Sequence, residues 1–123
     1  MAKILVVDDS LFMRKILSDI LLKEGHEIVG EAENAKEAVT SYRKLKPDAV
    51  TFDIVMPEMD GVNTMQAIRQ IRHYDKNARI LMVSAMGQQE LVVESIRAGA
   101  KDFILKPFQS FQIAGAIRRL LNQ

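Results

Sequence analysis

Ala49-Val50-Thr51-Phe52-Asp53 is the stretch that decides the fold, and Ile54-Val55-Met56-Pro57-Glu58-Met59-Asp60-Gly61 follows it. A mostly apolar run ends in one carboxylate, and the next segment contains Pro57 and Gly61, which favour turns. The pattern predicts a buried strand over 49–53 with Asp53 at its carboxyl end. In open α/β sheets this edge is where ligands bind, so Asp53 is the first candidate for a reactive residue.

The bulk composition limits the class of protein. The chain has 123 residues, of which 48% are hydrophobic and 27% charged, and we expect one domain over 1–123 with no second domain. A net charge of +1 gives no basic field for nucleic acid. Without cysteine there is neither a disulfide nor a thiolate metal site. The first apolar run, 4–7, is too short for a signal peptide or a membrane span, so a soluble cytoplasmic protein is expected.

Strand and helix patterns alternate along the whole chain. Mostly apolar runs predict strands at 4–7, 49–53, 79–84 and 102–106, and a weaker, more polar run predicts another at 27–32. Apolar residues at helical spacing predict helices after Ser10, Asn34, Gly61, Gln88 and Ser110. This alternation indicates a parallel sheet with right-handed crossovers. We therefore expect a flavodoxin-like, doubly wound, five-stranded sheet in the order 2-1-3-4-5.

The starts of three helices carry residues that cap helices. Ser10 and Ser110 are predicted N-caps, and Asn34 is predicted to cap its helix while Glu37 reaches back to it. The strand at 27–32 is the most polar of the five and is expected near an edge of the sheet.

Polar residues stand at the carboxyl ends of four predicted strands: Asp8, Asp9, Asp53, Ser84 and Lys106. Each has an ordinary explanation when taken alone, since Asp9 could cap a helix, a serine could sit in a turn and a lysine could be solvated. Together, the three acids would repel one another by several kcal/mol, about 4 for each pair ~4 Å apart. A chain that gathers them is expected to bind a cation there, and hard oxygen ligands favour Mg²⁺.

A metal-bound carboxylate cluster suits phosphoryl transfer. One aspartate can attack phosphorus, and Lys106 and Ser84 can interact with the developing charge on the phosphoryl oxygens. The sequence contains no Gly-rich phosphate loop of the Walker type. His26 and His73 are isolated in the sequence and are expected to be ordinary surface residues.

The same residues resemble a known family. The Asp8-Asp9 pair, Asp53 with the loop through Gly61, Ser84-Ala85 and Lys106-Pro107-Phe108 resemble the receiver domain of two-component response regulators, over the whole chain. Two further segments, 10–14 and 84–89, are most similar to stand-alone chemotaxis regulators of the CheY type.

The resemblance implies a role for each site residue. Asp53 would be the phosphoacceptor, served by a histidine kinase phosphohistidine or by acetyl phosphate. Asp9, Asp53 and the Val55 backbone carbonyl would bind Mg²⁺ directly, and Asp8 would act mainly through a bound water. Lys106 would pair with the acceptor and then with the phosphoryl group, Ser84 would hydrogen-bond it, and small Ala85 would leave the phosphorus approachable.

The resemblance also implies a conformational switch. Ser84 would move toward the phosphoryl group, and Phe103 would then turn inward, although a strand aromatic is ordinarily a core residue. Phe103, Ile104, Val92 and Ser95 are candidates for the surface that changes, and the Lys106–Pro107 peptide is expected to be cis. Val55 and Met86 are apolar where relatives often carry polar residues, so neither can orient an attacking water.

The expected function is a response regulator in chemotaxis or flagellar motor control. It would catalyse its own phosphorylation and dephosphorylation but act mainly as a signalling switch, and as a monomer. Its partners would be a CheA-like histidine kinase, a FliM-like flagellar switch protein and a CheC/CheX-type phosphatase, with no nucleic acid and no membrane.

The same fold is compatible with other functions. The chain could be a phosphorelay intermediate, or the excised receiver of a longer regulator. A phosphatase of the haloacid dehalogenase type would need a second acid two residues after its nucleophile, where Val55 stands, and a flavodoxin would need a phosphate loop where Asp8, Asp9 and Ser10 stand.

Overall fold

The computed structural model describes residues 1–122 and shows five strands alternating with five helices. The strands, in chain order, are β1 (Lys3–Val7), β2 (Glu27–Ala32), β3 (Ala49–Asp53), β4 (Ile80–Ser84) and β5 (Asp102–Leu105). The helices are α1 (Leu11–Lys23), α2 (Ala35–Leu45), α3 (Thr64–Tyr74), α4 (Gln89–Ala98) and α5 (Ser110–Leu121). Each predicted element is present, with ends within a few residues of those expected.

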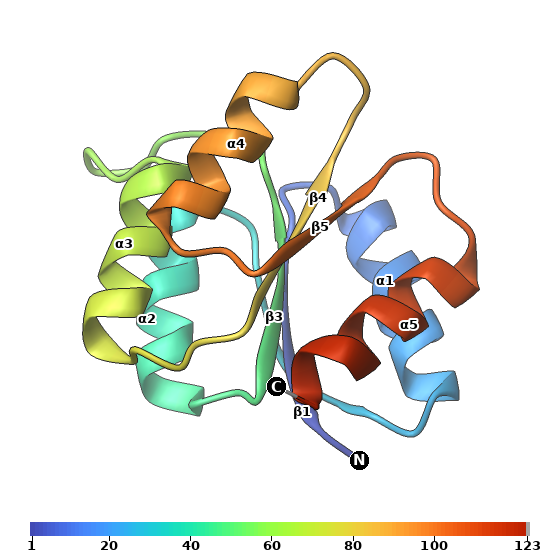
Figure 1. The fold of residues 1–123 in the computed structure, drawn as a ribbon. Helices are drawn as coiled ribbons and strands as arrows, with labels where there is room; N and C mark the ends of the chain where they lie inside the picture. The colour runs from blue at the N-terminus through green and yellow to red at the C-terminus, as the bar shows by residue number, and fades with distance from the viewer. Residues whose placement is uncertain (123) are drawn as a thin grey trace.

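The strands form one parallel sheet in the order β2-β1-β3-β4-β5, as predicted. β2, the most polar strand, lies at one edge, and β5 lies at the other. Helices α2, α3 and α4 cover one face of the sheet, and α1 and α5 cover the other (Figure 1). The order places β1 beside β3, where the direction of the crossovers reverses.

Alternate residues of the central strands enter two separate cores. In β1, Leu5 and Val7 face the α2–α3–α4 layer, whereas Ile4 and Val6 face α1 and α5. All four side chains are fully buried. Since successive side chains of a strand point to opposite faces, a continuous apolar run is what a strand covered on both faces requires.

The helix starts correct two of the predicted caps. Ser10 caps α1 as expected, its Oγ accepting a hydrogen bond from the Met13 N–H. The cap of α5 is Gln109, one residue before Ser110, and it forms a reciprocal capping box with Gln112. Ser110 is therefore the first helical residue rather than the cap, a shift that propensity alone does not resolve.

The capping of α2 is also simpler than predicted. The Asn34 side chain accepts a hydrogen bond from the Glu37 N–H. The Glu37 carboxylate accepts one from the Asn34 side-chain amide at 3.5 Å and not from the Asn34 backbone N–H.

Across residues 1–122, every helix is too short or too polar to cross a bilayer.

Candidate active site

The carboxyl ends of the strands meet at one edge of the sheet, at the top of Figure 1. Parallel pairing brings the ends of β1, β3, β4 and β5 to this edge, and each strand either ends in a predicted site residue or is followed by one or two. We call this cluster the acid pocket and define it as Asp8, Asp9, Asp53, Ser84 and Lys106. The predicted convergence is thus present in the fold.

Asp53 is the last residue of β3 and is only 8% exposed. Its Oδ1 lies 3.4 Å from the Lys106 Nζ, which comes from the segment after β5. Burial of the carboxylate raises its pKa to about 6, and the nearby negative charge of Asp8 adds to this, while Lys106 acts in the opposite direction. Asp53 is therefore an aspartate whose charge is only partly compensated.

The two neighbouring acids differ in exposure. Asp8 is 1% exposed, its Oδ1 accepts the Ser10 N–H at 2.9 Å, and its Oδ2 has no hydrogen-bond partner among residues 1–122. Burial raises the pKa of Asp8, partly offset by the Ser10 hydrogen bond and by Lys106, whose Nζ lies 3.6 Å from Oδ2. Asp9 is exposed and does not cap α1, because Ser10 does.

Three carboxylates converge closely enough to share one cation. One oxygen each from Asp8, Asp9 and Asp53 lies within 4.8 Å of the others. At that separation two unit charges repel by about 3 kcal/mol at an effective dielectric near 20, and only Lys106 forms ion pairs with the cluster among the described residues. Hard oxygen ligands and an unpartnered buried Oδ2 are what a divalent cation would satisfy.

Two buried hydroxyl groups on β3 and β4 have no hydrogen-bond partner in the part of the chain that the structure describes. Ser84 is fully buried at the end of β4 with its Oγ unpaired, and Thr51, in the middle of β3, is the second case. Unpaired buried polar atoms are uncommon and often mark functional sites. Thr51 was not singled out from the sequence, since a threonine inside a strand has an ordinary β-propensity explanation.

Two further groups shape the pocket. The Arg14 guanidinium donates to the Asp8 carbonyl at 2.7 Å and to Glu31 at 2.8 Å, which links α1 to β2 below the acids. The Lys106–Pro107 peptide is cis, as the resemblance implied. No role beside the acids was predicted for Arg14, whose only signal is its place in the first turn of the helix that follows them.

The loops that follow β3 and β4 carry small or apolar side chains. Val55 is 50% exposed and Met86 80% exposed, each in a loop that follows a strand. Ala85, next to Ser84, is exposed, and its N–H donates to the Gln88 side chain. Neither Val55 nor Met86 can therefore orient a water molecule by hydrogen bonding from its side chain.

Phe103 faces outward in this structure, with 41% of its surface exposed. It lines an open hollow of about 350 Å³ between α4 and β5, together with Ala85, Met86, Gln89, Val92, Val93 and Leu105. The interpretation of Phe103 as an ordinary core residue does not hold for this conformation.

Two of the residues predicted for the changing surface, Ser95 and Ile104, do not lie on it. Ser95 is fully buried, its Oγ donating to the Val92 carbonyl, whereas Val92 is 8% exposed and lines the hollow beside Phe103. Ile104 packs against the α1–α5 core, because it alternates with Phe103 along β5. The exposed apolar residues of this face are Met86, Val93, Ile96, Phe103 and Leu105.

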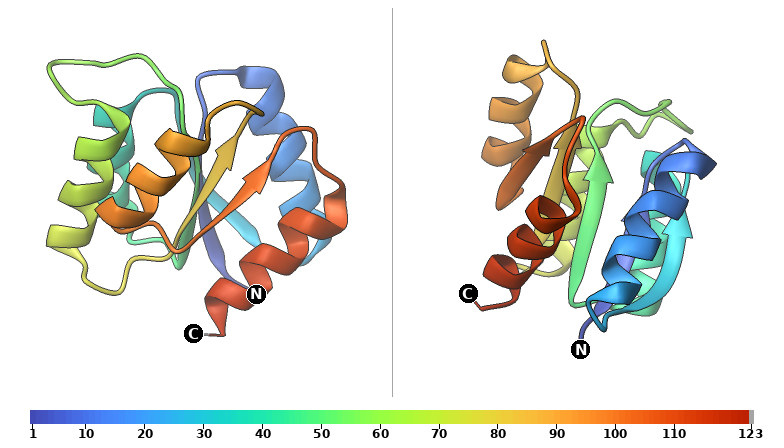
Figure 2. Two further views of the ribbon diagram at one scale, coloured as in Figure 1. Left: turned by 45° about the horizontal axis from the view of Figure 1, so that its top comes forward. Right: turned by 90° about the vertical axis from the view of Figure 1, so that its right-hand side faces the viewer.

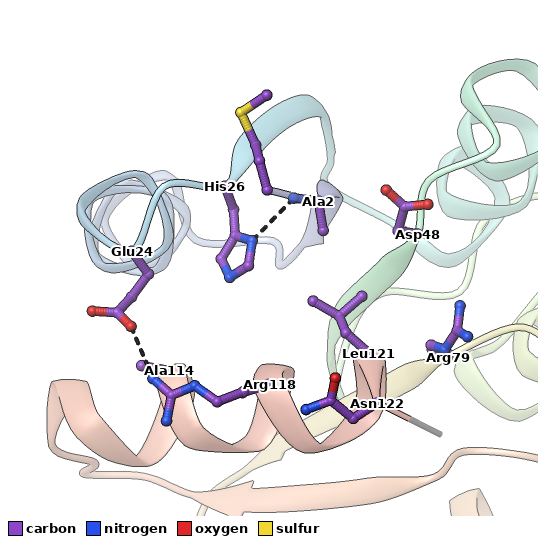
Figure 3. A pocket seen from close by; sticks show the side chains of 10 residues that line it. Ala2, Glu24, His26, Asp48, Arg79, Ala114, Arg118, Leu121 and Asn122 are labelled. Atoms are coloured by element: carbon purple, nitrogen blue, oxygen red, sulfur yellow. Dashed lines mark hydrogen bonds and ion pairs between the residues drawn. The ribbon is translucent and has the colours of Figure 1, made fainter.

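The two histidines lie far from the acids and differ from each other. His73 is exposed, as expected. His26 is half-buried at the opposite end of the sheet, where its Nδ1 accepts the Ala2 N–H at 3.3 Å (Figure 3). Its description as an ordinary surface residue is therefore wrong.

The sequence as a whole matches the family model of the response regulator receiver domain over residues 4–118. The chain belongs to this family. As a receiver domain it is 54% identical to the chemotaxis protein CheY of Bacillus subtilis (strain 168) over 120 residues, which cover 98% of each chain. It is 52% identical to CheY of Thermotoga maritima, over 96% of each chain. It is thus homologous to CheY, a chemotaxis response regulator.

Solved structures agree with the fold of this receiver domain. A CheX–CheY–BeF3–Mg complex from Borrelia burgdorferi contains a chain that is 38% identical, with a TM-score of 0.86 over 96% of this chain and 87% of that one. The receiver domain of NtrX from Brucella abortus is 31% identical, with a TM-score of 0.89 over 98% of both chains.

Proposed function

We propose that this receiver domain is a phosphorylation-dependent switch in which Asp53 accepts a phosphoryl group in a Mg²⁺-dependent reaction. The geometry around Asp53 carries the proposal. A nearly buried carboxylate lies 3.4 Å from the Lys106 ammonium and shares a cluster with two further acids. Such an arrangement concentrates negative charge beside one cation in a place that phosphate donors can approach.

The residues present fit Mg²⁺. Asp8, Asp9 and Asp53 supply carboxylate oxygens within 4.8 Å of one another, and the buried Oδ2 of Asp8 lacks a hydrogen-bond donor among the described residues. These three residues and the Val55 backbone carbonyl would hold the ion. When bound, Mg²⁺ would offset the repulsion among the acids and polarise the oxygens of the incoming phosphoryl group.

In the transfer step, one carboxylate oxygen of Asp53 forms a bond to phosphorus as the donor bond breaks. With a phosphohistidine donor the P–N bond breaks and its electron pair stays on the imidazole nitrogen; with acetyl phosphate the P–O bond breaks and acetate leaves. The Asp53 pKa of about 6 leaves most of this carboxylate ionised at neutral pH, as a nucleophile must be.

Two side chains then respond to the new charge. The Lys106 Nζ, already paired with Asp53, can move to a phosphoryl oxygen. The Ser84 hydroxyl is buried and has no partner within residues 1–122, so it can donate to another oxygen without breaking a bond that the structure shows. Movement of Ser84 would open space beside β4 for Phe103, which is exposed and lies on the neighbouring strand β5.

The relatives suggest the signalling context. Proteins that are 52–54% identical are chemotaxis proteins CheY, and one similar chain was solved in complex with CheX. We therefore propose a CheA-like histidine kinase as donor, a FliM-like flagellar switch protein as target and a CheC/CheX-type phosphatase. The target would contact the apolar face that contains Val93, Phe103 and Leu105.

The test is phosphorylation by acetyl phosphate, read by intact mass and by peptide mapping. With Mg²⁺ the wild type should gain one phosphoryl group on Asp53, and with EDTA it should gain none. Asp53→Asn should gain none in either condition, while Asp48→Asn, a matched change just before the other end of the same strand, should behave as wild type. Phosphorylation at another residue, or unchanged labelling of Asp53→Asn, would contradict the proposal.

A second assay separates a switch from a relay. A switch should gain affinity for a FliM-type peptide when phosphorylated. Efficient return of the phosphoryl group to a purified histidine phosphotransfer domain, with no gain in peptide affinity, would favour the relay.

A further inference from the structure

A second surface, remote from the acid pocket, has the properties of a docking site. Helices α2 and α3 lie side by side on one face of the sheet (Figures 1 and 2). Between them is a groove of about 620 Å³, lined by Val39, Arg43, Arg69, Gln70, His73 and Tyr74. We call this the α2–α3 groove. Both helices begin near the acid pocket and end away from it, and the lining residues come mainly from their later turns.

The spacing of these residues places them on two facing stripes. Val39 and Arg43 are four residues apart on α2, as are Arg69 and His73 on α3. Residues at this spacing share one side of a helix. The groove is therefore built on two rigid helices and not on loops.

The floor of the groove is aromatic and held in place. Tyr74 is 44% exposed, and its ring meets the buried ring of Tyr42 edge-on, with centroids 6.5 Å apart. Tyr42 is itself anchored, because its hydroxyl donates to Asp75 at 2.7 Å. On the other side the Arg43 guanidinium lies 5.3 Å from the Tyr74 ring centre. A fixed apolar surface beside a cation suits an apolar anchor next to an acidic group.

The rim of the groove is cationic and lacks acidic partners. Arg43, Arg69 and His73 line it, and a shallower neighbouring hollow adds Lys44; no carboxylate lines either hollow. None of these four side chains forms an ion pair within residues 1–122, whereas Lys36 in the first turn of α2 pairs with Asp60, and Arg14, Arg118 and Arg119 form ion pairs elsewhere.

The charge of this region contrasts with that of the whole chain. Residues 35–46 and 64–76 contain seven Lys or Arg and two acids, a net charge of +5, so the rest of the chain has a net charge of −4. Of the two acids, Asp75 is held by Tyr42 and Glu37 lies at the start of α2. The positive charge is thus local, and too limited in extent for the long phosphate track of a nucleic acid.

The geometry points to a docking site in the α2–α3 groove for an acidic peptide segment of a protein partner, bearing one apolar anchor side chain that packs on Tyr74. Complementary charge at the rim would direct association and fix orientation, and the aromatic floor would supply the buried contact. This site is separate from the acid pocket and does not depend on phosphorylation.

The probe is a fluorescent eight-residue peptide of glutamate and aspartate with one central phenylalanine, titrated by anisotropy into unphosphorylated protein. We expect saturable binding that weakens as salt is raised. A peptide with lysine at every acidic position should not bind, and replacement of the phenylalanine by serine should weaken binding at least fivefold. Amide NMR shifts should concentrate on 39–44 and 69–74.

Matched variants test the location. Arg43→Glu with Arg69→Glu should weaken binding at least tenfold, whereas Lys15→Glu with Lys23→Glu, an equal charge change on exposed positions of α1 on the opposite face, should change it less than twofold. Tyr74→Ser should weaken binding at least fivefold and Tyr74→Phe less than twofold. Arg43→Gln and Arg69→Gln, each made singly, keep the test valid if the double variant misfolds.

Several results would overturn the proposal: no saturable binding of the acidic peptide, equal losses in the α1 and groove variants, or equal binding of the lysine peptide. Tighter binding of duplex DNA or anionic vesicles than of the peptide, lost in the same variants, would assign the surface to another class of partner and would also overturn it.

Discussion

The two ends of the sheet both gather ionisable side chains but pair them differently. At the carboxyl ends, Asp8, Asp9 and Asp53 cluster together, and within residues 1–122 only Lys106 forms ion pairs with them, to Asp8 and Asp53. At the opposite end, opposite charges alternate around an open pocket of about 500 Å³ (Figure 3). There Glu24 pairs with Arg118 at 3.3 Å, and the Asp48 carboxylate accepts the Lys3 N–H at 2.7 Å.

The contrast distinguishes opposite charges that pair and stabilise the fold from like charges that lie close together and destabilise it. Asp48 has a donor within hydrogen-bond distance, whereas burial and Asp8 raise the pKa of Asp53 to about 6. A site that must bind a cation and a phosphoryl donor benefits from negative charge that the protein does not neutralise. The same charge lowers the stability of the folded protein when no ligand is bound. Equivalent substitutions at the two ends should therefore have opposite or unequal effects.

The largest effect is expected from the same substitution at each end. Because the folded state raises the pKa of Asp53 from 3.8 to about 6, ionisation of this group destabilises the fold as pH rises through that range. In EDTA at pH 7.5, Asp53→Asn should raise the free energy of unfolding by roughly 1–3 kcal/mol. At pH 4 the difference should nearly vanish. Urea denaturation at both pH values measures this.

Asp48→Asn is the control, and it should be neutral or slightly destabilising. Its side chain is exposed, and it loses only the charge on a hydrogen bond to Lys3. Equal shifts of the same sign in both variants would contradict the contrast between the two ends.

The second largest effect is expected when the positively charged side chain at each end of the sheet is removed. Lys106→Met leaves Asp8 and Asp53 buried without their ion pairs and should lower the free energy of unfolding by about 2 kcal/mol at pH 7.5 in EDTA. Arg118→Met breaks an exposed pair with Glu24 and should cost less than about 1 kcal/mol. Similar urea midpoints for the two variants would show that the carboxylates of the acid pocket do not repel one another enough to need Lys106.

Bound Mg²⁺ should offset the repulsion among the acids and so reduce the difference between the two ends of the sheet. If the acids bind it in the folded state only, free Mg²⁺ at roughly ten times its Kd should stabilise the wild type by about 1.4 kcal/mol. Thermal denaturation over a Mg²⁺ series should show this shift in Asp48→Asn as well, but a much smaller one in Asp53→Asn. A flat series for the wild type would count against metal binding.

The smallest effect concerns His26 at the paired end. Burial lowers its pKa, and the N-terminal ammonium and Arg118 act in the same direction. A lowered pKa stabilises the fold above pH 6.5, and that stability is lost as pH falls. Asparagine can still accept the Ala2 N–H without titrating, so His26→Asn should lose slightly less stability between pH 7.5 and 5.5 than the wild type. His73→Asn should match the wild type, and if it instead matched His26→Asn, the assignment to His26 would fail.

The fold was predictable because its signals are local. The three central strands β1, β3 and β4 are mostly apolar runs covered on both faces, and each helix has its own period and stop, such as Gly25 just after α1. Errors arose where neighbours in sequence compete, as with Gln109 and Ser110 at the start of α5. Others arose where the decision depends on packing: Ile104 and Phe103 alternate along β5, but only the position of α5 determines which of them is covered.

The sequence by itself determined the order of strands and helices, and with it the placement of acids, a serine and a lysine at strand ends that parallel pairing brings together. Only the tertiary structure decided that Asp8 is buried while Asp9 is exposed, that Ser84 and Thr51 lack partners within the described chain, and that unpaired cations gather between α2 and α3. The reason is physical. Strand and helix patterns depend on nearest neighbours along the chain, whereas burial and charge interactions depend on distances between residues far apart in sequence.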